Sequence, residues 1–180
     1  MLSLGISCNY HDSAVALSDE NSVLFAAQEE RFTRRKGDSS FPTLALDALL
    51  KHYKISIEDI THISYYENPK LKRQRILKTF ARNFPTNISQ IQNFVETYEH
   101  ERFFPLENIE NLFSKEVKFY QHHQSHAASS FFPSPFESAA VLVMDGVGEW
   151  DSTSIYAASR SKPFLNQLES EIFPDSVGLF

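Results

Sequence analysis

Cysteine is almost absent from the sequence. Cys8 is the single cysteine in 180 residues, so the chain cannot form a disulfide within itself. The chain does not open with the charged head, apolar core and small-residue cleavage site of a secretory signal. Its uncharged apolar runs stay well short of the about 20 residues that a membrane-spanning helix needs. These absences predict a soluble protein of the cytoplasm with no membrane partner.

Positive charge is the minority charge. The chain carries 17 Lys and Arg against 23 Asp and Glu, which gives a formal net charge of −6. General nucleic-acid binders show a clustered excess of positive charge, so nucleic acid is not the expected partner. Hydrophobic residues make up 42% of the chain, which is enough to close a core and excludes a disordered tail. The length fits one domain or part of a larger one.

Hydrophobic periodicity predicts an α/β fold in which a mixed sheet opens with a three-strand meander and is flanked by helices. The expected strands cover residues 2–7, 14–17, 23–28, 60–66, 117–120, 139–145 and 153–158. The expected helices follow Pro42 as far as Tyr53 and cover 70–82, 87–102 and 122–132. Ser56 and Asp59 have the spacing of a capping box. The strand 139–145 is expected to be buried, and Leu77 is expected on the apolar face of helix 70–82.

The densest chemical signal is the run His122-His123-Gln124-Ser125-His126. On a helix, His122 and His126 lie one turn apart on the same face, while His123 points elsewhere. Asp145, at the end of the strand 139–145, would add a carboxylate where α/β sheets place their ligands. Two imidazoles and a carboxylate suit iron or zinc. The alternative is a helix N-terminus whose histidines cap or pack, and the spacing alone leaves both interpretations open.

Two turns hold further candidate residues. Gly146 and Gly148 follow Asp145. They could bring backbone amides close to a phosphate, or they could serve an ordinary hairpin that needs positive φ. His11, in the turn after the first strand, could act as a general base or orient a carbonyl. The alternative for His11 is an exposed polar side chain without a catalytic role.

Most of the basic residues fall in two patches. Arg31, Arg34, Arg35 and Lys36 follow the third expected strand and could meet an anionic ligand. Six more lie between Lys70 and Arg82, where the solvated face of a helix is the simpler interpretation. Cys8 is interpreted as a small buried hydrophobic residue and is assigned no role.

Five segments of the chain together resemble a known family. They are Leu4-Gly5-Ile6-Ser7 with Tyr10-His11-Asp12-Ser13-Ala14, then Gln28 to Lys36 with Phe41-Pro42, then His122 to Ser129, then Pro133-Ser134-Pro135-Phe136, and then Asp145 to Trp150. In that order they resemble the amino-terminal domain of the O-carbamoyltransferases, the enzymes of antibiotic tailoring and of the nodulation-factor class. The resemblance implies a partial domain of the actin, sugar-kinase and Hsp70 type, related to the tRNA threonylcarbamoyltransferases.

The resemblance also implies an activity. Enzymes of this family make carbamoyl adenylate from carbamoyl phosphate and ATP in a carboxy-terminal domain. The amino-terminal domain then transfers the carbamoyl group to a hydroxyl, here of a small molecule. By this resemblance, His11 would be the active-site base and Lys36 would contact the adenylate. Asp145, Gly146 and Gly148 are also expected to contact the cofactor.

The family's metal site falls on residues already singled out. An iron-type metal, Fe(II) or another divalent ion, would be held by His122, His126 and Asp145, with a further aspartate from later in the chain. The resemblance runs from Leu2 to the last residue and ends inside the family's FPxSxGL segment.

Residues 1–180 are therefore expected to be the amino-terminal part of the carbamoyltransferase domain. The rest of that domain and the adenylate-forming domain would come from a separately encoded carboxy-terminal part. Two alternatives stay open. One is a tRNA threonylcarbamoyltransferase-like enzyme, against which the acidic composition and the basic run 31–36 count. The other is a non-catalytic remnant or interaction module.

Overall fold

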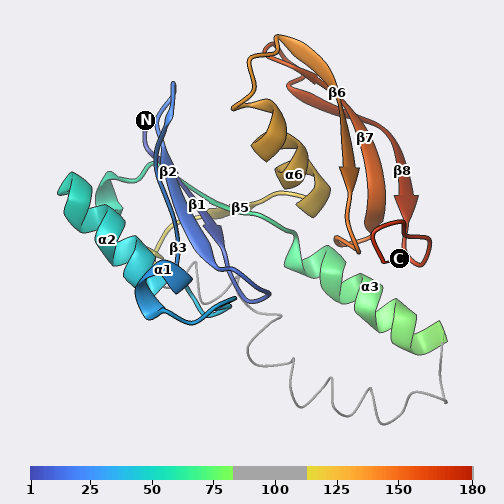
Figure 1. Cartoon of the computed structure of the whole chain (residues 1–180), viewed down its shortest axis with the longest axis horizontal. Coiled ribbons are helices and arrows are strands. Elements are labelled where there is room, and N and C mark those ends of the chain that lie inside the picture. Colours follow the sequence, from blue (N-terminus) through green and yellow to red (C-terminus); the bar gives the residue numbers. More distant parts are fainter. Residues whose placement is uncertain (83–112, 180) are drawn as a thin grey trace. The chain divides into compact units, whose positions relative to one another are not determined.

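The first 28 residues form three antiparallel strands in the computed structural model, which describes residues 1–82 and 113–179 (Figure 1). β1 (Ser3–Ser7) pairs with β2 (Ala14–Ser18), and β2 pairs with β3 (Val23–Gln28). Burial alternates from residue to residue along β1 and β2, because successive side chains of a strand point to opposite faces. The expected meander is confirmed.

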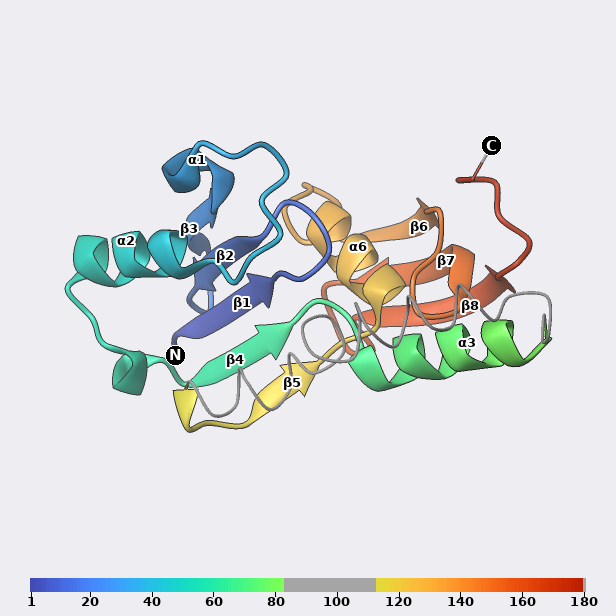
Figure 2. The same ribbon diagram turned by 90° about the horizontal axis from the view of Figure 1, so that it is seen from below.

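Two further strands extend this sheet in parallel. β4 (His62–Tyr65) pairs with β1, and β5 (Val117–Phe119) pairs with β4. The sheet order is therefore β3-β2-β1-β4-β5, and Figure 2 shows β1, β4 and β5 running in the same direction. This mixed sheet confirms the expected α/β class.

α2 (Thr43–Tyr53) packs on the sheet with the apolar side that its sequence predicts. Leu46 and Leu49, three residues apart, are both buried. η1 (Ile57–Asp59) then begins at the capping box of Ser56 and Asp59, as expected. The core that these elements share with the sheet includes Leu4, Ile6, Val15, Leu17, Leu49, Ile60, Ile63, Tyr65 and Val117.

Glu29 joins the end of β3 to the start of α2. It directly precedes α1 (Glu30–Thr33). Its buried carboxylate accepts the backbone N–H groups of Leu44 and Ala45, at 3.0 and 2.8 Å. The first N–H groups of a helix have no acceptor inside the helix, and a negative charge there also suits the helix dipole. Glu29 therefore fixes where α2 begins.

The described residues form two compact units, the first with residues 1–66 and 113–119 and the second with residues 67–82 and 120–179. The second unit has an antiparallel sheet of β6 (Ser138–Met144), β7 (Asp151–Ser159) and β8 (Leu165–Ile172), in that order. α6 (His122–Phe131) packs on one face of this sheet (Figure 1). Ala127, Val143 and Tyr156 form a small core between them.

α3 (Pro69–Arg82) also belongs to the second unit. Its Lys78 lies over the ring of Trp150, with the nitrogen 5.1 Å from the ring centroid. Leu77 is 49% exposed, so the expectation that it packs on the apolar face is wrong. The partly covered side of the helix passes through Ile76 and Phe80 instead.

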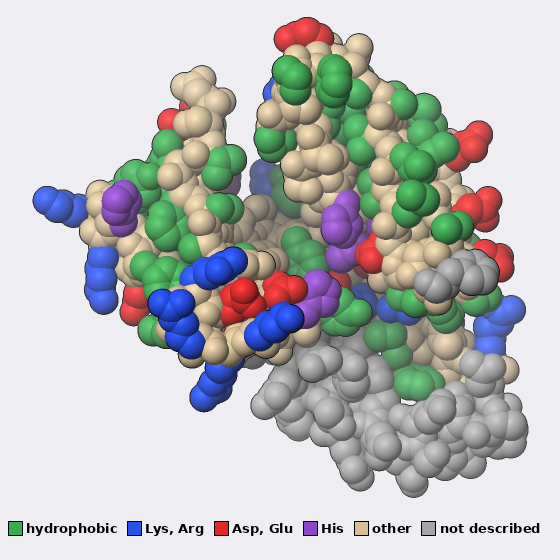
Figure 3. Space-filling view, in the orientation of Figure 1, with side chains coloured by type: hydrophobic (Ala, Val, Ile, Leu, Met, Phe, Trp, Pro, Cys, Tyr) green, Lys and Arg blue, Asp and Glu red, His purple; other side chains and the backbone are tan. Residues whose placement is uncertain are grey.

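The expectation of a buried strand over 139–145 is also wrong. β6 exposes Leu142 and Met144, by 57% and 59% of their surfaces. The physical reason is that α6 packs on one face of this sheet, and Leu142 and Met144 lie on the other face, since successive side chains of a strand alternate. Hydrophobic side chains accordingly reach the surface of the second unit (Figure 3).

Three further sequence expectations concern a helix over 87–102, membrane-spanning segments and Cys8. The helix expected over 87–102 lies outside the described residues. Within the described ranges, no helix is both long and apolar enough to cross a membrane. Cys8 is buried, as expected, and its thiol lies 3.9 Å from the hydroxyl of Tyr65.

Candidate metal centre

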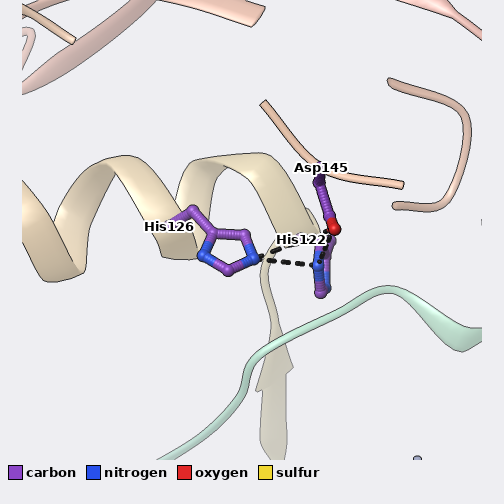
Figure 4. A group of neighbouring side chains, drawn as sticks. All are labelled: His122, His126 and Asp145. Carbon is purple, nitrogen blue, oxygen red and sulfur yellow. Dashed lines mark hydrogen bonds and ion pairs between the residues drawn. The ribbon is translucent and has the colours of Figure 1, made fainter. Parts of the chain in front are cut away.

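The start of α6 brings two imidazoles to one side of the helix. His122 is the first residue of α6, and His126 lies one turn further along. Their Nε2 atoms are 3.0 Å apart, and their rings meet edge to face (Figure 4). The spacing of four residues thus produces the one-face arrangement that the sequence predicts.

Asp145 completes the group from the end of β6. Its Oδ2 lies 2.7 Å from Nε2 of His122 and 3.8 Å from Nε2 of His126. Because β6 ends at Met144, Asp145 is the first residue of the turn that follows. The donor atoms of the three residues all lie within 4.8 Å of one another.

The electrostatics of the group favour metal-binding protonation states. Hydrogen bonds from His122, and from the backbone N–H of Gly146 at 2.6 Å, hold the pKa of Asp145 well below its usual range. Burial, and then the neighbouring His122, lower the pKa of His126. A deprotonated carboxylate and a neutral imidazole are the forms that bind a metal ion.

The donor geometry fits a first-row divalent metal ion. Zinc binds imidazole nitrogen and carboxylate oxygen at about 2.0–2.2 Å in a tetrahedral arrangement, so neighbouring donors stand about 3.3–3.6 Å apart around it. The three observed separations of 2.7, 3.0 and 3.8 Å lie on both sides of that range, so small side-chain rotations would equalise them. Two histidines and one carboxylate also suit iron. The described residues therefore contain a possible metal-binding group.

His123 points away from this group and packs inside the second unit. It is 1% exposed, and its Nδ1 lies 2.7 Å from the hydroxyl of Ser154 on β7. Burial lowers the pKa of His123, because a charged ring is poorly solvated there. His123 thus joins α6 to the sheet as a neutral side chain.

This burial makes His123 a source of acid sensitivity. The pKa of an unfolded histidine is about 6.5, and the folded-state value is lower, so the unfolded state binds more protons as the pH falls. The stability that neutral His123 contributes is complete above about pH 6.5 and is lost as the pH falls through the folded-state pKa. Chemical denaturation at a series of pH values should show this loss of stability. His123→Gln should make the free energy of unfolding depend less on pH over this range. The exposed His52→Gln is the control and should leave the slope unchanged.

The turn after Asp145 allows α6 to approach it closely. A Cβ on Gly148 would lie 3.1 Å from His123 Cδ2 and 3.2 Å from His122 Cβ, so a side chain there would press on both histidines. Neither Gly146 nor Gly148 has positive φ, so the interpretation of a hairpin that needs positive φ is wrong. The N–H of Gly148 donates to the carbonyl of Asp151 at 2.8 Å. Contact of these glycines with a phosphate stays a prediction.

Two residues near position 180 support Asp145 and were missed in the sequence. The hydroxyl of Ser176 donates to the backbone carbonyls of Asp145 and Gly146, at 3.1 and 2.7 Å. Gly178 packs directly on the same backbone, where an added Cβ would overlap the carbonyl of Asp145. The available signal was the FPxSxGL segment, in which both residues stand, but their contact with Asp145 was not predicted.

The other two predicted site residues, His11 and Lys36, belong to the first unit. His11 lies in the exposed turn between β1 and β2, with Nδ1 2.9 Å from Asp12 Oδ2. Lys36 is exposed in the segment that follows α1. Figure 3 shows basic side chains gathered with acidic ones over α1 and this segment. The roles of His11 and Lys36 stay predictions.

The family model described as Carbamoyltransferase N-terminus matches residues 3–180. The chain belongs to this family. This match confirms the family resemblance that was based on five segments of the sequence. Relatives include uncharacterized protein sll1178 of Synechocystis sp. (41% identical over 189 residues), uncharacterized protein MJ1051 of Methanocaldococcus jannaschii (29% over 177) and nodulation protein NolNO of Sinorhizobium fredii (28% over 176).

These relatives are much longer than the chain. The matches cover 98%, 98% and 94% of this chain but 30%, 28% and 24% of the three relatives, in the same order. The chain therefore spans less than a third of the length of each. Among solved structures, YeaZ from Pseudomonas aeruginosa matches 96% of this chain and 66% of its own, with a TM-score of 0.51 and 11% identity. This likeness shows the fold alone, and it confirms the expected actin and Hsp70 type.

Proposed function

We propose that this chain of the carbamoyltransferase family takes part in moving a carbamoyl group from carbamoyl adenylate to a hydroxyl of a small molecule. Carbamoyl phosphate and ATP would supply the adenylate. The observation that carries the proposal is the convergence of His122, His126 and Asp145 within 4.8 Å, in a chain that the family model matches almost from end to end.

The proposed site holds positive charge against an anionic ligand. A metal ion, Fe(II) or another divalent ion, would polarise the oxygens of the bound nucleotide or carbamoyl group. His122, His126 and Asp145 would hold that ion, with Asp145 as the anionic donor. In the first unit, Lys36 would place a positive charge against the adenylate phosphate. In the second unit, the backbone amides of Gly146 and Gly148 would approach a phosphate.

His11 would act as the general base. The acceptor hydroxyl oxygen bonds to the carbamoyl carbon while its proton passes to His11. The bond from that carbon to the adenylate oxygen then breaks, and AMP leaves. The carboxylate of Asp12, 2.9 Å from Nδ1 of His11, orients the ring and stabilises the imidazolium that forms.

Release of AMP tests this function. The chain is mixed with carbamoyl phosphate, ATP and Fe²⁺, with water as the acceptor. The part of the Synechocystis relative outside the matched segment is added as the source of adenylate. We expect AMP release that depends on carbamoyl phosphate and needs both polypeptides. His11→Ala should lower it by about 100-fold or more, since a positioned general base contributes about 10²–10⁴-fold.

His52→Ala, which removes an exposed histidine of the same unit, is the matched control and should release AMP at the original rate. Equal rates for His11→Ala and the unchanged chain would contradict the role of His11. AMP release that does not need the chain at all would favour a non-catalytic remnant. A threonylcarbamoyl product on added tRNA, when threonylcarbamoyl adenylate is supplied as the donor, would favour the tRNA-modifying alternative.

A further inference from the structure

A buried carboxylate lies at the start of α6 beside the candidate metal centre. Glu149 is 5% exposed and lies four residues after Asp145 in the turn between β6 and β7. Both of its carboxylate oxygens lie 3.0 Å from the backbone nitrogen of His122. Its Oε1 also lies 2.5 Å from the backbone nitrogen of Asn68. Glu149 thus accepts N–H groups from two segments that are far apart in the sequence.

These N–H groups belong to the beginnings of two helices. His122 is the first residue of α6, and Gln121 before it makes no side-chain cap. Asn68 immediately precedes α3. Because the N–H groups of a first helical turn have no acceptor inside the helix, Glu149 supplies the cap that Gln121 does not. It also ties the start of α6 to the start of α3 within the second unit.

His122 is therefore held at both ends by one turn. Its ring contacts Asp145, the first residue of the turn, at 2.7 Å. Its backbone N–H contacts Glu149, four residues further along the same turn. Gly148 lies between Asp145 and Glu149 and packs closely against His122 and His123. A Cβ on Gly148 would lie 3.2 Å from His122 Cβ, so a side chain at this position would press on His122. The distance between the His122 ring and Asp145 thus depends on where the backbone of His122 is anchored.

We propose that Glu149 is a positioning residue of the metal centre, which sets the separation of the His122 ring from Asp145 by anchoring the His122 backbone. The inference rests on the proposed metal site. Loss of the carboxylate would leave a partly buried N–H without its acceptor, and the first turn of α6 would move or fray to reach water. His122 would then leave the position from which it shares a metal ion with His126 and Asp145.

The experiment compares Glu149→Ala and Glu149→Gln with the unchanged chain. Zn²⁺ is the probe, and calorimetry after removal of bound metal gives its affinity. Glu149→Ala should weaken binding by about 10- to 100-fold, the usual cost of losing a group that orients a metal ligand. Glu149→Gln keeps one oxygen that can accept the His122 N–H, so it should recover part of that loss.

Glu29 offers a matched control. It is also a buried glutamate that caps a helix, since it accepts the N–H groups of Leu44 and Ala45 at the start of α2. Glu29 and the N–H groups that it caps lie in the first unit, whereas the metal centre lies in the second. Glu29→Ala should lower the free energy of unfolding, as loss of a cap does, and leave Zn²⁺ affinity within about twofold. Equal losses of affinity in the two alanine variants would reduce Glu149 to a general stabilising residue and overturn the proposal.

A readout in metal-free protein separates this inference from the metal site itself. The ¹⁵N shifts of the His122 ring report its hydrogen bond with Asp145. Glu149→Ala should change these shifts and expose the His122 amide to exchange, while Glu29→Ala should not. If the unchanged chain binds no Zn²⁺ but the shifts respond, the metal site fails and the positioning of His122 by Glu149 stands. If the shifts of a folded Glu149→Ala variant match the unchanged chain, the positioning role is wrong.

Discussion

His126→Ala should bind Zn²⁺ at least about 100-fold more weakly than the unchanged chain, since it loses a direct ligand and even indirect supports of a ligand commonly cost about 10- to 100-fold. The two donors that remain, His122 and Asp145, are already hydrogen-bonded to each other at 2.7 Å. A metal ion would have to displace the hydrogen bond between His122 and Asp145, and without His126 it would gain only two ligands from the chain. Calorimetric titration with Zn²⁺ after treatment with a chelator measures the change.

The control for this result is an exposed histidine outside the group. His62 lies exposed on β4 in the first unit, and His62→Ala should leave Zn²⁺ affinity unchanged. His123 is a poorer control than its sequence position suggests, because it is buried and bonded to Ser154, so its loss disturbs packing. If His62→Ala and His126→Ala weaken binding equally, the histidines bind zinc by surface chelation and no single centre exists.

Gly178→Ala is expected to disturb the centre from outside its ligand set. The added Cβ would overlap the backbone carbonyl of Asp145, and two backbones cannot yield as a flexible side chain can. The segment around Ser176 would have to move off the turn, and the hydrogen bonds of Ser176 to the carbonyls of Asp145 and Gly146 would break. We expect about 1–3 kcal/mol of lost stability and about 10-fold weaker Zn²⁺ binding.

Thermal or chemical denaturation and zinc calorimetry together measure this effect. Gly5→Ala is the control, because its Cβ would meet Ser64 and Ala16 only at 3.7 and 3.8 Å, which is ordinary contact. Gly5→Ala should lower both the stability and the Zn²⁺ affinity much less than Gly178→Ala does. A Gly178→Ala variant with unchanged stability and zinc affinity would show that residues 176–179 do not support Asp145.

Local pattern was enough to predict most of the elements. The alternation along β1 and β2 and the spacing of Leu46 and Leu49 on α2 are properties of neighbouring residues, so they are visible in the sequence. The pair His122 and His126 was predictable for the same reason, since residues four apart share a helix face. Asp145 was found because a strand boundary is also a local signal.

The features that the sequence did not disclose depend on contacts between distant segments. Nothing near Glu149 indicates that its carboxylate meets the backbone of Asn68 and His122. The close packing of Gly178 on Asp145 is likewise a long-range contact. The burial of β6 was misjudged because an apolar run does not show whether one or both faces of its sheet are covered: the face that carries Val143 packs on α6, while Leu142 and Met144 lie on the other face.

The double hold on His122 also limits where the chain can change length. Surface connections commonly tolerate inserted residues, and the segment between β7 and β8, residues 160–164, is such a connection. The turn from Asp145 to Glu149 is different, because its first residue meets the ring of His122 and its last residue meets the backbone of the same histidine. One inserted residue would move one contact while the other stayed in place. Relatives that keep this centre should therefore vary in length elsewhere and hold the Asp145–Glu149 turn at five residues.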